Sequence, residues 1–152
     1  MKAKDFAEIV GIGAVVVSLS LLTYELRQNT MATQQAAAAN YAQGHRDIEL
    51  FAAGDAEFAE LILTAISGDD LTGLERFRLD LFYRSILRAW QNSYFQYRAG
   101  GLTEEVWSAE LRFMSSIAPD EAGMLSHWRR EKYVYTEEFV ELFDSLISES
   151  DQ

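Results

Sequence analysis

An apolar run near the N-terminus restricts the fold and location of this chain more than any other segment. Residues 6–24 contain one charged side chain, Glu8, close to the start of the run. A helix over 6–24 is about 28 Å long at about 1.5 Å per residue, close to the hydrocarbon core of a bilayer at about 30 Å. The run predicts a transmembrane helix over Phe6–Tyr24 in contact with membrane lipid, so residues 1–24 are expected to form a membrane anchor.

Two other interpretations compete with a retained membrane helix. A signal peptide also has a basic start, here Lys2 and Lys4, but it needs small residues at a cleavage site directly after the apolar run. The residues that follow, Thr23–Asn29, provide no such site. A buried helix of a globular domain normally has a polar face, whereas apolar residues cover this helix on all sides: Ile9, Val10, Ile12, Val15, Val16, Val17, Leu19, Leu21 and Leu22. A retained anchor fits best, and the other two interpretations stay open.

Small residues form a stripe along the predicted span. Ala7, Gly11, Ala14 and Ser18 follow one another at steps of four, three and four residues, which places them on one helix face. In lipid, helices associate mainly where small residues let their backbones approach closely. The stripe therefore suggests association with a second copy or with another subunit of a membrane complex. Glycine, alanine and serine are also common in membrane helices, so a stripe without this role is an equal alternative.

The charge balance excludes some partners. The chain has 13 Lys and Arg, 24 Asp and Glu, and a net charge of -11. A nucleic-acid partner needs a basic surface, and docking on anionic lipid needs basic clusters, so neither is expected. Lys2 and Lys4 before the span, against Arg27 after it, place the N-terminus in the cytoplasm by the positive-inside rule. The C-terminal domain is then expected on the extracytoplasmic side of a bacterial inner membrane.

Turn and capping residues divide the rest of the chain into helices. Residues 25–54 are rich in Ala and Gln, which are good helix formers, so the anchor helix is expected to continue as a stalk. Thr72 and Glu75 have capping-box spacing. Further helices, in a domain over 55–152, are predicted over Asp55–Ile66, from Thr72 to Ala99, from Thr103 to Pro119, from Pro119 through Trp128, and after Thr136.

No alternating strand pattern appears in the sequence. We therefore predict an all-α fold in which an N-terminal transmembrane helix continues into a long helix. This long helix packs with about five further helices in a small bundle.

The third predicted helix, from Thr72 to Ala99, is expected to be central because aromatic residues occupy more than one of its faces. It also carries a polar stripe at a spacing of four residues: Arg84, Arg88, Asn92 and Gln96. In one interpretation the arginines pair with acidic residues of neighbouring helices and fix the packing. In the other, the stripe lines a pocket for an anionic or polar ligand. The structural interpretation is favoured, and the ligand site is kept as the alternative.

No group of residues in the sequence supports catalysis or cofactor binding. His45 and Glu49 lie four residues apart on the predicted stalk and could face one metal ion, but no third ligand accompanies them. Ser126 and His127 are adjacent, and adjacent helical residues point about 100° apart. The chain has no cysteine, which excludes thiolate catalysis and cysteine-based zinc sites. We therefore predict no catalytic residue, no metal and no cofactor, and a protein that is not an enzyme.

Three segments resemble a widespread bacterial family of uncharacterised activity, whose members have one N-terminal transmembrane helix and a small helical domain. These segments are Tyr24–Asn29 after the span, Trp90–Gln96 followed by Gly101, Leu102 and Trp107, and Trp128-Arg129 leading to Glu138-Phe139. The resemblance implies the predicted architecture and no particular activity.

Two functions fit these observations. The favoured one is a single-pass membrane protein that acts as a scaffold or accessory subunit through helix association, as a homo-oligomer or within a larger complex. The alternative is a membrane-tethered ligand-binding or sensory module with a pocket on the third helix.

Overall fold

The computed structural model describes residues 3–117 and 122–150, with side chains described for 11–117 and 123–148. Within these ranges the chain forms six α-helices, one 3-10 helix and no strand, which confirms the all-α prediction. The chain divides into two units, residues 1–36 and 37–152. The elements are α1 (Ala3–Gly54), α2 (Ala56–Ile66), α3 (Gly73–Arg98), α4 (Glu104–Ile117), α5 (Ala122–Glu131), η1 (Lys132–Val134) and α6 (Glu137–Ser150).

The part of α1 in the first unit exposes apolar side chains on all its sides. Each of these side chains is more than half exposed: Ile12, Val15, Val16, Val17, Leu19, Leu21, Leu22 and Leu26. The hydroxyls of Ser18, Ser20 and Thr23 each donate to the carbonyl four residues earlier, at 2.8–2.9 Å. These three hydroxyls therefore form their hydrogen bonds within the helix itself.

A search of the side chains that the structure describes found no helix with a stretch both long and apolar enough to cross a membrane. The predicted span starts at Phe6, and its residues 6–10, including Ala7 of the small-residue stripe, lie outside the described side chains. One unbroken helix, α1, runs from Ala3 to Gly54 through the residues predicted as anchor and stalk. The membrane span itself stays a prediction.

Local interactions set the helix ends in the second unit. The Asp55 carboxylate accepts a hydrogen bond from the backbone N–H of Phe58 at 3.0 Å and caps α2. Thr72 and Glu75 form the predicted capping box, in which each side chain accepts from the backbone N–H of the other residue. Gly100, with a φ of 74°, follows the end of α3 in the left-handed conformation that glycine adopts without strain.

The fifth helix differs from its prediction at its C-terminal end. The predicted helix stops at Trp128, whereas α5 continues to Glu131 and is followed by the 3-10 turn η1. Arg129 and Arg130 occupy the last turn of α5, where positive charge stabilises the carbonyl end of a helix. The predicted start at Pro119 lies outside the described residues.

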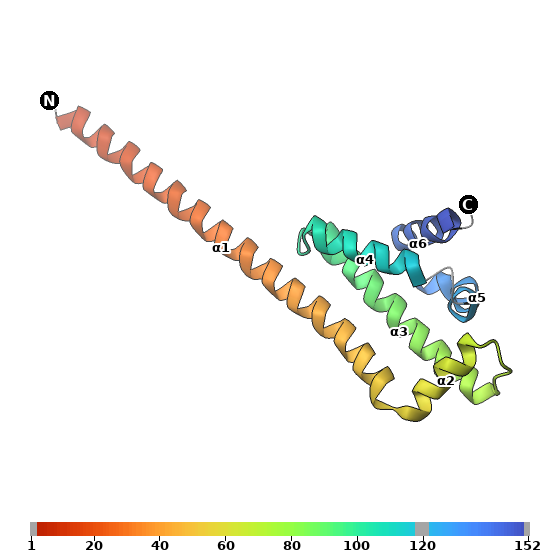
Figure 1. Cartoon of the computed structure of the whole chain (residues 1–152). Helices are drawn as coiled ribbons and strands as arrows, with labels where there is room; N and C mark the ends of the chain where they lie inside the picture. Colours follow the sequence, from red (N-terminus) through yellow and green to blue (C-terminus); the bar gives the residue numbers. More distant parts are fainter. Residues whose placement is uncertain (1–2, 118–121, 151–152) are drawn as a thin grey trace. The chain divides into compact units, whose positions relative to one another are not determined.

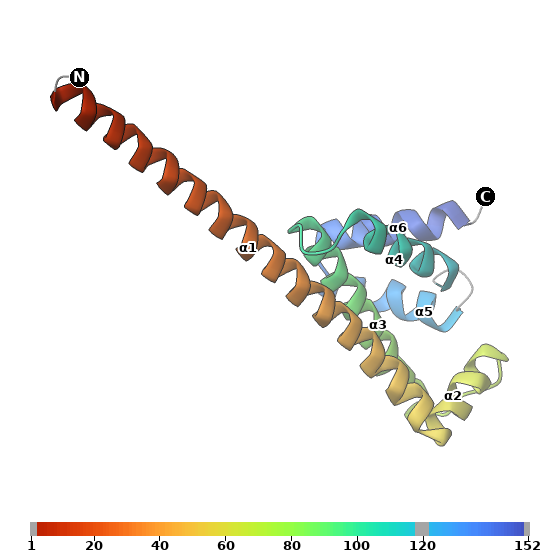
Figure 2. The same cartoon turned by 60° about the vertical axis from the view of Figure 1, so that its left-hand side comes forward.

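α3 is the central helix of the second unit, as predicted. It packs against α4 and α5, and α4 in turn packs against α6 (Figures 1 and 2). The buried side chains of α3 are Leu79, Tyr83, Leu87, Trp90, Ser93 and Tyr94. Two aromatic residues of α3 are on the solvent side, with Phe77 59% and Phe95 38% exposed.

An aromatic cluster around Trp128 joins α5 and η1 to α6. The Trp128 ring lies 4.6 Å from the Phe143 ring and 5.2 Å from the Tyr135 ring, centroid to centroid. Its indole N–H donates to Asp144 at 2.8 Å, and Lys132 donates to the same carboxylate at 2.7 Å. The apolar surface of Trp128 is therefore packed inside the core, and its only polar group has a hydrogen-bond partner there.

The second-unit part of α1 passes very close to the turn between α3 and α4. A Cβ atom placed on Gly101 would lie 2.8 Å from the Cβ of Ala37, closer than real Cβ atoms approach. Only glycine fits there without a shift of the backbone. Further along α1, Tyr41 and His45 bond to Glu110 of α4, and Ala52 packs against the core.

Candidate functional site

Two adjoining apolar cavities lie between the end of α1 and the centre of α3. The first, here called the Trp90 cavity, has a volume of about 270 Å³ and is lined mainly by apolar residues that include Ala52, Ile86, Ala89, Trp90, Phe113 and Met124. The second, called the Phe51 cavity, has a volume of about 420 Å³ and is lined by residues that include Phe51, Phe58 and Leu81. Ile48 and Phe82 line both cavities, so the two share a wall.

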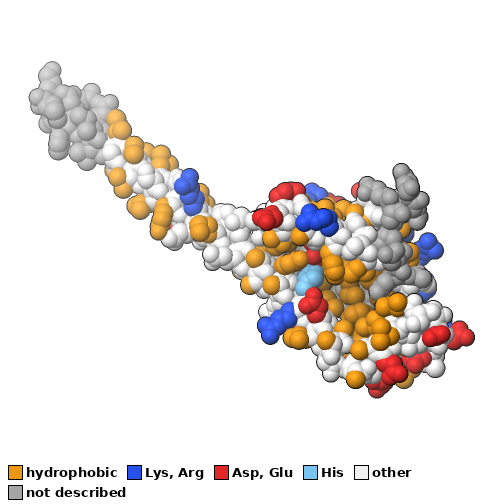
Figure 3. Space-filling model, in the orientation of Figure 1, with side chains coloured by type: hydrophobic (Ala, Val, Ile, Leu, Met, Phe, Trp, Pro, Cys, Tyr) orange, Lys and Arg blue, Asp and Glu red, His pale blue; other side chains and the backbone are white. Residues whose placement is uncertain are grey.

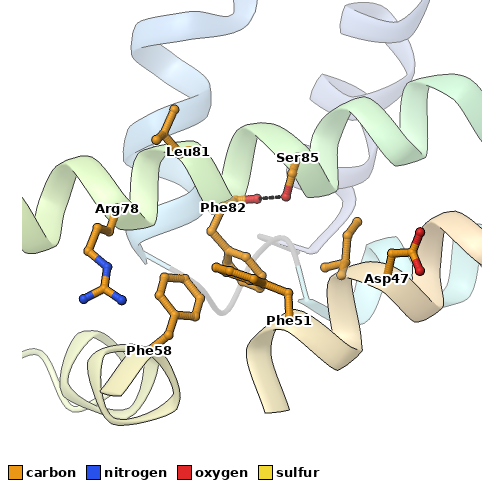
Figure 4. Close-up of a pocket in the computed structure, with 8 residues that line it drawn as sticks. Asp47, Phe51, Phe58, Arg78, Leu81, Phe82 and Ser85 are labelled. Atoms are coloured by element: carbon orange, nitrogen blue, oxygen red, sulfur yellow. Dashed lines mark hydrogen bonds between the residues drawn. The ribbon is translucent and has the colours of Figure 1, made fainter. Parts of the chain in front are cut away.

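Three phenylalanines from three helices form the wall of the Phe51 cavity (Figure 4). The ring of Phe58 lies 5.0 Å from that of Phe51 and 5.1 Å from that of Phe82, centroid to centroid. The guanidinium of Arg78 lies 5.5 Å from the centre of the Phe58 ring, in a cation–π arrangement. Figure 4 also shows the carboxylate of Asp47 turned away from the rings.

Polar side chains are confined to one edge of the Trp90 cavity. Of its lining residues only His45 and Glu49 are polar, and both lie on α1, one turn apart. Figure 3 shows one face of the molecule, on which orange side chains surround a pale blue histidine with red carboxylates beside it.

A buried carboxylate, Glu110 of α4, connects α4 to α1 at this edge. Glu110 is 2% exposed and accepts hydrogen bonds from the Tyr41 hydroxyl at 2.7 Å and from the His45 ring at 2.8 Å. The second ring nitrogen of His45, Nδ1, lies 3.0 Å from the backbone carbonyl of Tyr41. We call Tyr41, His45 and Glu110 the α1–α4 latch.

With Glu110 ionised, the latch geometry favours the protonated form of His45. Both ring nitrogens face oxygen atoms, the Glu110 carboxylate and the Tyr41 carbonyl, and both contacts are hydrogen bonds only if each nitrogen carries a proton. The hydrogen bond with Glu110 raises the pKa of His45 above its usual 6.5, and burial opposes this effect only in part. Burial and the hydrogen bond to Glu110 also raise the pKa of the Tyr41 hydroxyl, so this residue donates throughout the physiological range.

The structure does not place the predicted polar stripe of α3 at either of these cavities. Arg84 pairs with Glu131 at 3.2 Å, and the Arg88 guanidinium lies 5.6 Å from the centre of the Tyr135 ring. Asn92 is exposed, and the side-chain oxygen of Gln96 is buried without a hydrogen-bond partner. Neither cavity described above is lined by any of the four residues. A polar-ligand site on the stripe stays a prediction. The residues of α3 that line the two cavities are different ones.

The two histidines have separate environments. His45 belongs to the latch, and the Nδ1 atom of His127 lies 3.0 Å from the Asp80 carboxylate. The Ser126 hydroxyl accepts from Arg130 at 2.7 Å. Among the described side chains, no three residues of the types His, Cys, Asp and Glu converge as metal ligands.

Neither Glu110 nor Tyr41 belongs to a recognisable sequence motif. The spacing of Glu110 along its helix nevertheless indicates that it is buried. Glu110 lies three residues after Trp107 and four before Met114, on the face that α4 buries. An acidic residue at helical spacing within an apolar face is expected to have a buried partner. No local pattern identifies that partner, because the two residues that bind Glu110 lie 65 and 69 positions away.

Comparisons with known proteins found no matching family model, no matching curated protein and no matching solved structure. The resemblance to a bacterial membrane-anchored family therefore stays a prediction.

Proposed function

We propose that this protein is a membrane-anchored, non-catalytic helical module that holds an apolar ligand in the Trp90 and Phe51 cavities. The observation that carries the proposal is the pair of adjoining apolar cavities. Ligand sites are typically concave, mainly apolar and provided with a few polar groups at fixed positions, with volumes of about 300–1,000 Å³. The two cavities together have this size and this composition.

The exposed apolar surface of α1 supports the anchor. In water, a helix that is apolar on all its sides would expose a large unfavourable surface, and residues 12–26 of α1 have this character. The internal hydrogen bonds of Ser18, Ser20 and Thr23 leave no side-chain hydroxyl of these three unsatisfied in a lipid environment. On the charge balance of its flanks, the N-terminus is cytoplasmic and the helical unit extracytoplasmic.

Filling the Trp90 cavity from within is expected to abolish ligand binding. The probe is 1-aminoanthracene, an uncharged aromatic amine whose fluorescence rises in apolar surroundings, added to the full chain in phosphatidylcholine nanodiscs. Ala89→Leu places extra carbon atoms in the cavity, and we expect the probe to bind at least about tenfold more weakly. Ala42→Leu, on an exposed part of α1 that lines neither cavity, is the matched control. Equal binding to wild type and Ala89→Leu, after subtraction of empty nanodiscs, would contradict the proposal.

A second candidate function is a scaffold or accessory subunit that associates through α1. It is favoured by the open surface at the small-residue stripe. A Cβ atom placed on Gly11 would meet no atom beyond the local helix backbone within 4 Å, and Ala14 and Ser18 are exposed. Such a surface lets a second backbone approach closely in lipid. The two functions are compatible, because the stripe and the cavities lie in different units.

Cross-linking in native membranes tests the anchor and the association together. The full chain is expected to sediment with membranes after an alkaline carbonate wash and to give a cross-linked species above the monomer. Gly11→Leu and Ala14→Leu each place a bulky side chain on the stripe and keep a second backbone at a distance. Each is expected to reduce the cross-linked species severalfold. Val16→Leu, on the opposite side of the helix, should leave it unchanged. A chain that washes into the supernatant would refute the anchor, and equal cross-linking in all variants would refute the role of the stripe.

A further inference from the structure

We propose that the ligand of the Trp90 cavity is a cationic amphiphile, with an alkyl chain inside the cavity and a protonated amine at Glu49. This inference rests on the proposed function. The proposed function specifies only an apolar ligand, and the inference specifies in addition that its head group is positively charged. It follows from where the polar groups of the cavity lie and from which of their charges are already compensated.

The polar end of an amphiphile has one position available in this cavity. Glu49 and His45 are the polar residues among those that line it, and they lie on one face of α1. The remaining walls come from apolar side chains of α1 to α5, such as Ile86, Phe113 and Met124. A head group placed anywhere else would lose its water without gaining a partner.

The uncompensated charge at this position is negative. When His45 is protonated, its positive charge is paired with Glu110 at 2.8 Å, and Glu49 contributes less than Glu110 to the raised pKa of this imidazole. Glu49 is exposed and forms no ion pair with any described side chain. The edge therefore carries the charge of one carboxylate, which attracts a cation and repels the carboxylate of a fatty acid.

The Phe51 cavity also has a carboxylate of α1 among its lining residues, although this carboxylate is turned away from the rings (Figure 4). Asp47 lines it and, within the described side chains, is also without an ion pair. Besides His45, whose partner is Glu110, the lining residues include one basic side chain, Arg78, which is already paired with Asp55 at 3.6 Å and with Glu57. Neither edge offers an uncompensated positive charge, and the whole chain has a net charge of -11.

The test compares three probes that share an eight-carbon chain and differ in the head group: octylamine, 1-octanol and octanoate. Each displaces 1-aminoanthracene from the full chain in phosphatidylcholine nanodiscs at pH 7, with empty nanodiscs subtracted. Octylamine is protonated at this pH, as lysine is. We expect octylamine to act at concentrations about three- to fivefold lower than 1-octanol, the size of effect that an exposed ion pair provides. Octanoate should be the weakest, and 0.5 M NaCl should reduce the differences.

Matched variants test this inference separately from the proposed function. Glu49→Gln should remove the preference for octylamine, and Glu141→Gln, on the exposed surface of α6, should keep it. If wild type prefers octanoate, or treats all three probes alike, the cationic ligand is refuted, while displacement by 1-octanol that Ala89→Leu blocks still supports the apolar site. If no probe displaces 1-aminoanthracene in a manner sensitive to Ala89→Leu, the proposed function fails as well.

Discussion

Replacing Trp128 with alanine is expected to lower the free energy of unfolding of the helical unit by about 3–5 kcal/mol. The indole is 1% exposed and contacts the rings of Tyr135, Phe139 and Phe143. The substitution removes the buried apolar surface of the indole, the largest of the side chains, and leaves a cavity where α5, η1 and α6 meet. The Asp144 carboxylate also loses its hydrogen-bond donor on the ring.

Chemical denaturation of the purified full chain, followed by circular dichroism, measures this loss. Tyr133→Ala is the matched control, because Tyr133 is an aromatic residue of η1 that is 78% exposed, and it should change the stability little. Trp128→Phe keeps most of the ring and removes the N–H donor, so it should fall between wild type and alanine. Equal effects of Trp128→Ala and Tyr133→Ala would show that the aromatic cluster does not stabilise the unit.

Breaking the α1–α4 latch from one side is expected to cost about 3 kcal/mol, since it leaves a buried carboxylate without its charged partner. His45→Leu removes the imidazolium and leaves Glu110, which is 2% exposed, with the Tyr41 hydroxyl alone. The double variant His45→Leu with Glu110→Leu removes both charges and should recover much of the loss, because buried ion pairs are often replaceable by apolar residues. If the double variant were as unstable as the sum of the single variants, Glu110 would not depend on His45.

The same pair gives the stability of the protein a pH dependence of defined sign. The pKa of His45 is raised in the folded chain above its unfolded value of 6.5. Its contribution is therefore complete below about pH 6.5 and is lost as the pH rises through the folded pKa. Unfolding measured between pH 5.5 and pH 9 should show wild type weakening toward the alkaline end, whereas the His45→Leu, Glu110→Leu variant should lack this part of the dependence. A wild type that gains stability over this range would contradict the latch.

The helices of this fold could be predicted because their signals are local. The Thr72–Glu75 capping box depends on residues three apart, and the structure shows it. The helix predicted over Asp55–Ile66 is present as α2, with Asp55 as its cap. The central position of α3 also followed from the sequence, because aromatic residues on several faces of one helix need several neighbours.

The cavities and the latch could not be predicted, because they depend on how distant helices meet. The Trp90 cavity combines residues from α1 to α5, and no local pattern indicates that their side chains leave a space. The spacing of Arg84 and Arg88 showed that they share a helix face, but it did not show that Glu131 and Tyr135 would cover this face. Helical periodicity identifies which residues lie together on one helix, whereas their partners depend on tertiary packing.

The close approach of Ala37 to Gly101 sets a size limit that two positions share. A methyl group already occupies the space on one side, so a larger residue at either position would act as a wedge between the helix and the turn. Tyr41 and His45 follow Ala37 at one and two turns along the same face, and their hydrogen bonds to Glu110 tolerate little lengthening. The spacing between these two backbones therefore also limits how far Tyr41 and His45 can stand from Glu110 without losing their hydrogen bonds.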